Sequence, residues 1–557
     1  MNRIATEADK IVYGDYIVPG DLIIDTPTKV LADGSKEVNY YFMAKEWPGI
    51  AEGATIWIDG EKLGFTNLLR FRNTSDSLVP WTISKARIKN IPHTQVVTGG
   101  ISCDGLKDWE LDGQCQHYPG LTKWSPSRKF ASGHFGFHVK NIAVHGIGGS
   151  VLDGGTIKLR GFECQFGFSG VRLNSAEKPV TIESTVIENF YIHDTYDGEG
   201  FYLGSTQSGQ LPKLKNLKIR NGFLARTGAE AVQVQHLVGG ADIRNVILYA
   251  CDTNWLNAFQ SGQDTGIQWV CASGLNNLSY VIVDGYASNG MIPFGSDQDL
   301  LNASKGRSVV SNILFNDGRA IGMYQHNSAK FGMSWEYDNL YFRGFNESYA
   351  VTGKSRLPYI ISRKWGTDPV KFGRIIHDGS KDRVFDSMDG IISGEVILDK
   401  EMPAPNYQNS GFTEPASQIM FWHQFYGKYF PNADNTPTKW ERGDIAIDRT
   451  AGRHLFCKCL VSHTATEVRP ADNPAQFEIL KWDSNGVRSD QPGYRHGDPL
   501  QSAFPPDDLR LKSTCYWRKK GFGVKGVSER LDIVDEYVFD GYRVTVLSDG
   551  SVHENIV

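Results

Sequence analysis

Short apolar runs, bounded by Asn, Gly and other polar residues, recur along the middle of the chain. Six runs between Asn189 and Gly353 share one form, in which a starting residue (Asn in five cases) precedes three apolar or small residues. Successive starts lie about 24 to 35 residues apart, and a period between roughly 20 and 50 residues is typical of repeat proteins. The six runs are Asn189–His193, Asn221–Ala225, Asn245–Tyr249, Tyr280–Asp284, Asn312–Asn316 and Asn339–Arg343.

A second apolar run follows most of the first ones after about ten residues, often beginning with Gly. Both kinds of run have the length of a strand, and no helical periodicity separates them. Asn suits the bends because its short side chain tolerates a left-handed backbone. The pattern predicts an all-β fold, a parallel β-solenoid in which each repeat is one coil. The second runs are Gly200–Leu203, Ala231–Val234, Gly290–Pro293 and Gly322–Gln325.

The third residue of each first run is also apolar, so apolar and polar residues do not alternate cleanly as in a strand with one solvated face. We therefore expect one outer face of the solenoid to be covered. A second copy of the chain, in a homotrimeric spike, is the hypothesis for the cover. These third residues are Tyr191, Phe223, Ile247, Ile282, Leu314 and Tyr341.

Changes in sequence texture divide the chain into five parts. Residues 1–54 are expected to form an N-terminal attachment or capping region, because an uncovered first coil would pair with other chains. Residues 55–400 are expected to form the coils, and a segment that opens with two closely spaced prolines, 401–436, a linker. A small β-rich module is expected over 437–484, and a closing coil and a C-terminal β-hairpin over 485–557.

Composition narrows the partners and the origin of the protein. The net charge is −5 with no long basic run, which disfavours nucleic acid, and no apolar run approaches the roughly 18 residues of a membrane span. Aromatic residues make up 12% of the chain, and many of them lie in polar stretches, which favours a binding surface. The first ten residues lack the apolar core of a secretory signal, and the eight cysteines lack disulfide-scaffold spacing. These features fit a protein made in a reducing cytosol that works outside it, such as a virion component.

Three segments carry a resemblance to known proteins: Ile56–Gly60, Leu69–Asn73 and His193–Gly204. Over about residues 55–400 the chain resembles right-handed parallel β-helix proteins related in shape to pectate lyases and phage tailspikes. The resemblance implies right-handed coils, and it describes a fold more than an activity.

A second resemblance covers about residues 437–484. An aromatic residue, Gly-Asp before an apolar strand, an aromatic strand, Pro and then Trp482 are similar to the chitin-binding type of small carbohydrate module. The chain has Trp440 and Phe456 where that pattern usually has Tyr. The resemblance implies that Trp440 and Trp482 stack on sugar rings, although Trp is also the usual core residue of so small a module.

The best candidates for chemistry are Glu199 and Glu230, which follow their Asn starts by nearly the same distance. Both are expected in one column on successive coils, with the carboxyl groups about 5 Å apart, near the roughly 5–5.5 Å of retaining glycosidases. Mutual repulsion would raise one pKa, leaving one acid and one base or nucleophile. Asp197 is a nearby third carboxylate. The alternative is that these residues only cap bends, as stacked polar residues commonly do in such folds.

Other residues are candidates for sugar contacts. Neighbouring columns offer hydrogen-bonding groups, and two tryptophans lie in what are expected to be polar insertions between coils. No metal or other cofactor is predicted, because the acidic residues of the loops lack fixed spacing, and Cys457 and Cys459 have the period of a core strand. The sugar-binding candidates are Tyr202, Gln233, Gln235, His236, Trp255 and Trp269.

These observations predict a phage tail or tailspike-type protein of the virion that recognises, and in the stronger version depolymerises, a cell-surface glycan. Such a protein would contact tail or baseplate proteins and would form a homotrimer. One alternative is a secreted bacterial polysaccharide hydrolase or lyase. Another is a purely structural virion or fibre component that makes no glycan contact.

Overall fold

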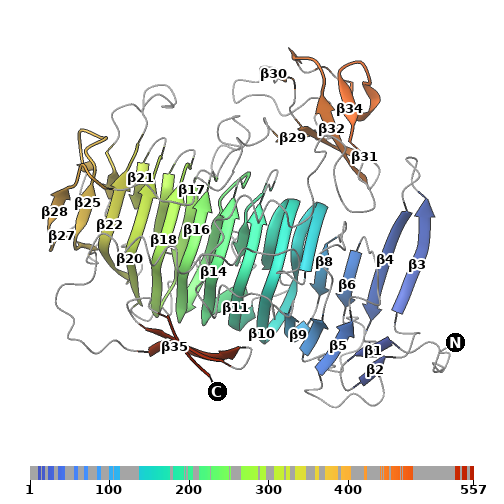
Figure 1. Ribbon diagram of the computed structural model, residues 1–557, viewed down its shortest axis with the longest axis horizontal. Helices are drawn as coiled ribbons and strands as arrows, with labels where there is room; N and C mark the ends of the chain where they lie inside the picture. The colour runs from blue at the N-terminus through green and yellow to red at the C-terminus, as the bar shows by residue number, and fades with distance from the viewer. Residues whose placement is uncertain are drawn as a thin grey trace.

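A computed structural model of the 557-residue chain shows an all-β protein dominated by one long parallel sheet system (Figure 1). The strands of this system run across the long axis of the molecule and follow one another along it (Figure 1). The structure describes residues 11–13, 16–18, 23–30, 36–43, 55–59, 68–72, 85–89, 100–104, 106–112, 137–175, 180–193, 195, 198–204, 212–225, 227–249, 251, 265–286, 289–295, 306–318, 321–325, 333–345, 358–362, 370–386, 391–402, 419–422, 439–440, 442, 445–450, 453–464, 466, 468–480, 533–539, 542–547 and 552–556.

The six predicted first runs lie on consecutive strands that pair in parallel. Each strand bonds to the strand one coil later, in one continuous register through the residues just after the six starts. The predicted parallel solenoid is therefore confirmed. The strands are β11 (Val180–His193), β14 (Leu217–Ala225), β16 (Ala241–Tyr249), β18 (Leu275–Asp284), β20 (Gly306–Asn316) and β22 (Met333–Arg343).

The predicted second runs form another parallel series on the next side of each coil. This series contains two strands that the sequence pattern missed, β17 and β23, because the chain takes longer than usual to reach them after Tyr249 and after Arg343. The strands are β12 (Phe201–Leu203), β15 (Val232–Gly239), β17 (Thr265–Cys271), β19 (Asn289–Gly295), β21 (Ile321–Gln325) and β23 (Ile360–Ser362).

A left-handed residue bends the strands where the repeats start. The backbone φ is +54° at Asn312 and +51° at Asn339, and Tyr280 has +53° at the equivalent place. One coil before the first start, Gly161 occupies the position equivalent to Asn189 and has φ +66°. The residue two positions before the bend and the residue directly after it can therefore both point inward, as Val310 and Ile313 do, which explains why alternation breaks there.

The interior is filled by stacked aliphatic and aromatic side chains. Phe190 and Ile192 point into this core, and their equivalents do so in the following coils, except that Gly222 takes the place of Phe190 on the next coil. The apolar third residues between them lie outside the core cluster, yet all six are at most 1% exposed within a single chain. Burial of these residues thus needs no second chain, and this column no longer argues for a trimer.

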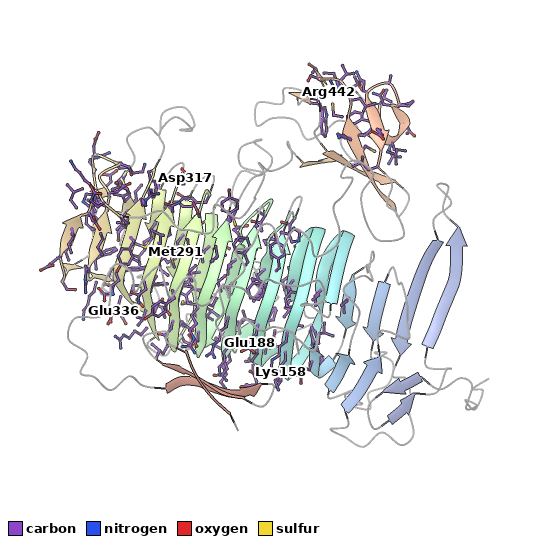
Figure 2. All side chains as sticks on the ribbon, in the orientation of Figure 1. Lys158, Glu188, Met291, Asp317, Glu336 and Arg442 are labelled. Carbon is purple, nitrogen blue, oxygen red and sulfur yellow. The ribbon has the colours of Figure 1, made fainter. Side chains whose placement is uncertain are left out.

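The outer face before the bend carries ion pairs between coils. Arg160 lies 3.2 Å from Glu188, and Arg220 lies 2.6 Å from Asp242. Lys158 and Glu188, labelled in Figure 2, lie on this outer face. Opposite charges on adjacent strands stabilise the register of the stacked coils.

The parallel ladder begins earlier than expected. β4 (Lys36–Met43) already pairs in parallel with β6 (Leu68–Arg72), and β3 (Ile23–Val30) joins β4 antiparallel. The last strand of this system, β28, ends at Leu398. The remaining strands of the system are β5 (Thr55–Asp59), β7 (Lys85–Lys89), β8 (Ile101–Asp104), β9 (Leu106–Asp112), β10 (Phe137–Ser175), β13 (Pro212–Lys215), β24 (Val370–Phe372), β25 (Ile375–His377), β26 (Phe385–Asp386), β27 (Ile391–Ile392) and β28 (Val396–Leu398), and a separate pair is β1 (Ile11–Tyr13) with β2 (Tyr16–Val18).

Smaller sheets follow the solenoid. A four-stranded sheet contains β29 (Ile419–Trp422), β31 (Ile445–Thr450), β32 (Arg453–Cys459) and β34 (Phe477–Ile479). The segment that we expected to be only a linker therefore contains a strand, β29, whose four apolar residues pair with β31. Beside this sheet are the pair β30 (Lys439–Trp440) and β33 (His463–Thr464) and the 3₁₀ turn η7 (Pro470–Asp472).

The C-terminal antiparallel sheet is β35 (Ile533–Phe539), β36 (Tyr542–Leu547) and β37 (Val552–Ile556), so the predicted C-terminal hairpin is confirmed. The expected closing coil lies outside the described residues. Within the described part of the chain, no helix has the length and apolarity needed to cross a bilayer.

Candidate functional site

Glu199 and Glu230 lie in one column on adjacent coils. The Gly200 N–H donates to the carbonyl oxygen of Glu230 at 2.9 Å, and Phe201 is paired with Val232 just beyond. The same register places Ser169 one coil before this pair and Thr265 one coil after it. The predicted placement of the two residues in one column on successive coils is therefore present, while the distance between their carboxyl groups and their chemical role stay predictions.

In the turn before each glutamate, a threonine hydroxyl donates to the carbonyl of the residue that directly precedes the glutamate. The Thr195 hydroxyl donates to the Gly198 carbonyl at 2.7 Å, and the Thr227 hydroxyl donates to the Ala229 carbonyl at 2.8 Å. The two turns are also joined, because the Gly228 N–H donates to the Thr195 hydroxyl at 3.0 Å. Such side-chain bonds fix a turn where the backbone leaves its ladder, so the two glutamates start from matched positions.

A small residue must follow each glutamate. A Cβ atom at Gly200 would lie 2.2 Å from Leu224 in the core, and Ala231 holds the equivalent place on the next coil. These small residues therefore face inward, against the core.

Both glutamates are buried. Glu199 is 4% exposed and Glu230 is 0% exposed. Burial raises the pKa of Glu199, opposed in part by a hydrogen bond from its own backbone and by the positive charge of Arg172. Oε2 of Glu199 has no hydrogen-bond partner among the residues that the structure describes.

Polar side chains adjoin the pair on the outer face of the second strand series. Arg172, Tyr202, Gln233 and Gln268 occupy one column over four coils. The Arg172 guanidinium lies 5.3 Å from the centre of the Tyr202 ring, and its Nε donates to Oδ1 of Asn174 at 3.0 Å. Arg172 is thus held on two sides, next to the buried Glu199.

Three glutamines form the other half of this polar surface. Nε2 of Gln233 donates to Oε1 of Gln268 at 2.7 Å, and Nε2 of Gln235 donates to the same oxygen. Gln233 and Gln235 are buried, whereas Gln268 is half-buried. His236 follows in a left-handed conformation, φ +55°, where the register shifts between Val234 and Leu237.

The structure thus brings together Glu199, Glu230, Tyr202, Gln233 and Gln235 on adjacent coils, with His236 at the neighbouring bulge. Asp197, Trp255 and Trp482 lie outside the described residues.

The prediction that Trp269 and Trp440 contact sugar is wrong, because both side chains are buried. Trp269 is fully buried in the core, with Nε1 donating to Ser308 at 3.0 Å, because β17 continues the second strand series where an insertion was expected. Trp440 is also fully buried and packs edge-to-face on Phe477 at 5.4 Å. Neither ring offers a face to a sugar. Cys457 and Cys459 are buried in β32, as expected for core positions.

Sequence reasoning missed Arg172, Asn174 and Gln268. The signal for them is positional, since each extends the outer-face columns of Tyr202 or Gln235 by a coil or two. Recognition of β17 as a coil strand would have placed Gln268 beside Gln233.

The fold and this cluster define a parallel β-solenoid with two buried glutamates in one column, next to a column of polar side chains. No protein-family model matches the chain, and no curated protein is significantly similar to it in sequence.

Proposed function

We propose that the protein is a tail or tailspike-type protein that binds a cell-surface polysaccharide and hydrolyses it at Glu199 and Glu230. The observation that carries the proposal is the burial of two carboxyl groups on adjacent coils, with the pKa of Glu199 raised by that burial. Adjacent coils are about 4.8 Å apart, and carboxyl groups roughly 5–5.5 Å apart are typical of retaining glycosidases.

The environment of each glutamate suggests its role. Glu199 with a raised pKa keeps its proton to a higher pH, which suits the general acid that protonates the glycosidic oxygen. Glu230 then acts as the nucleophile that attacks the anomeric carbon. After proton transfer, the charge of Arg172 stabilises the Glu199 carboxylate, which in turn accepts a proton from the water that hydrolyses the intermediate.

The neighbouring polar surface supports binding of a sugar chain. Tyr202, Gln233 and Gln235 offer hydroxyl and amide groups over two adjacent coils. The half-buried members of the cluster, Arg172 and Gln268, are the ones that solvent reaches. A ligand with many hydroxyl groups matches this surface better than an apolar one.

The test is incubation of the full chain with a panel of bacterial capsular and O-antigen polysaccharides. New reducing ends are expected with the wild type, whereas Glu199→Gln and Glu230→Gln bind the same polysaccharide and release roughly 10²–10⁴-fold less product. Full cleavage by Glu199→Gln would move the chemistry elsewhere. Unsaturated products would show that the polysaccharide is cleaved by elimination, as in a lyase, and not by hydrolysis.

The tail assignment predicts a homotrimer attached to tail or baseplate proteins of a virion. It is supported by the elongated solenoid and by the five buried cysteine thiols of the described residues, which are expected of a protein made in a reducing compartment. Light scattering that showed a monomer would favour a secreted hydrolase with the same site. Absence of binding to every polysaccharide would leave only a structural role.

A further inference from the structure

Gln268 occupies an unusual position, because one side-chain oxygen accepts hydrogen bonds from two other glutamines. Gln233 lies directly beside it in the register, and Gln235 lies two residues further along β15. Both Nε2 groups donate to Oε1 of Gln268. The carboxamide groups of Gln233 and Gln235 are therefore turned with their nitrogens toward a single point.

This arrangement fixes where the amide oxygens face. A carboxamide presents donors at one end and an acceptor at the other, so the oxygens of Gln233 and Gln235 are directed away from Gln268. Oε1 of Gln233 is buried and has no hydrogen-bond donor among the described residues. A buried acceptor normally has a hydrogen-bond donor from the protein or from ordered water, so this oxygen marks a place where a further donor can bind.

The chemistry of that donor follows from the neighbours. Glu230 lies three residues before Gln233 on the same coil, and Gln235 adds a second amide oxygen. A surface of acceptor oxygens beside a carboxyl group attracts neutral donors and disfavours anionic groups. Gln268 itself is half-buried.

We infer that Gln268 is a positioning residue that orients Gln233 and Gln235 to accept hydrogen bonds from free hydroxyl groups of a neutral sugar next to the cleavage point. The inference rests on the proposed function and deepens it by naming the chemistry of the sugar. O-methylation of those hydroxyls removes the donors, so it abolishes the same contacts from the ligand side.

Two substitutions with side chains of similar length separate the effect of the acceptor oxygen on binding from the effect of side-chain size. Gln268→Glu keeps an oxygen that both amides can bond, and Gln268→Met removes it. We expect Gln268→Glu to bind the polysaccharide retained from the panel within about twofold of the wild type, and Gln268→Met about tenfold more weakly, the loss of one or two hydrogen bonds. The weakening should appear in KM with kcat nearly unchanged. Lys371→Met, at an exposed position of β24, is the matched control.

The O-methylated form of the same polysaccharide completes the experiment. It should bind the wild type about tenfold more weakly, with little further loss in Gln268→Met, because both changes remove the same contacts. Wild-type affinity in Gln268→Met, or equal losses in Gln268→Glu and Gln268→Met, would overturn the positioning role alone. A wild type that binds no polysaccharide would overturn the proposed function together with this inference.

Discussion

Two carboxyl groups on different coils of the solenoid, Asp378 and Glu199, have opposite environments. Asp378 accepts hydrogen bonds from the Gly344 N–H at 2.7 Å, the Tyr359 hydroxyl at 3.1 Å, and the N–H and hydroxyl of Ser380 at 2.9 and 2.7 Å. Burial alone would raise the pKa of Asp378, but these bonds outweigh it and hold the pKa below its usual value. Burial dominates at Glu199 and raises its pKa.

The difference separates a structural carboxylate from a candidate reactive one. Every bond to Asp378 joins neighbouring coils or closes a turn, so its charge contributes to folding. Glu199 is buried with one oxygen that bonds to no described residue, an arrangement that disfavours folding and is common where chemistry requires it. Four predictions test this contrast.

The largest expected effect on stability is that of Asp378→Ala. The substitution leaves the Gly344 N–H and the Ser380 N–H without their charged acceptor. We expect the free energy of unfolding to fall by about 2–3 kcal/mol, since hydrogen bonds to charged groups contribute more than neutral ones. Urea denaturation measures the change, and Asp382→Ala, at an exposed position on the same turn, is the control. A loss no larger than that of the control would show that the bonds to Asp378 contribute nothing.

Tyr359→Phe should have a smaller effect in the same cluster. The Tyr359 hydroxyl donates to Asp378 and accepts from the Lys381 N–H at 2.8 Å. Burial raises the pKa of Tyr359 to about 12, so the hydroxyl stays protonated and remains a donor. Its removal is expected to lower the free energy of unfolding by about 1–2 kcal/mol while polysaccharide binding is unchanged. Altered binding would mean that this cluster belongs to the site.

The contrast also shows what the sequence could and could not predict. The six starts predicted the coil register, because Asn at a left-handed bend is a local signal that repeats in the chain. The same register predicted that Glu199 and Glu230 are adjacent. The partner set of Asp378 could not be predicted, since Gly344 and Tyr359 meet it only through the coil stacking.

The errors have equally physical causes. Trp269 was placed in an insertion because the long segment after Tyr249 hid the start of β17, and only pairing with β15 reveals it. Trp440 carries the aromatic pattern of a sugar-binding module, but a pattern of residue types does not determine which ring fills the core.

Glu199→Met should change stability in the opposite direction to Asp378→Ala. Replacement of a buried acid that is incompletely hydrogen-bonded by an apolar side chain of similar length is neutral or stabilising. We expect the free energy of unfolding at neutral pH to stay equal or rise by up to about 1 kcal/mol, with loss of polysaccharide cleavage. Urea denaturation and reducing-end release measure the two quantities. A clear drop in stability would place Glu199 among the structural carboxylates.

The smallest effect is the dependence of these differences on pH. The native pKa of Glu199 lies above the 4.5 of an ordinary glutamate, so the stability linked to its proton is complete below that pH and is lost as the pH rises through the native pKa. The advantage of Glu199→Met should therefore grow as the pH rises above about 4.5.

Asp378 behaves inversely, since its native pKa lies below the usual 3.8 and its contribution to stability is lost as the pH falls. The deficit of Asp378→Ala should accordingly shrink in acid. Urea unfolding of the three proteins from about pH 3 to 8 measures both trends, and parallel curves would show that the two carboxyl groups do not differ between the folded and unfolded states.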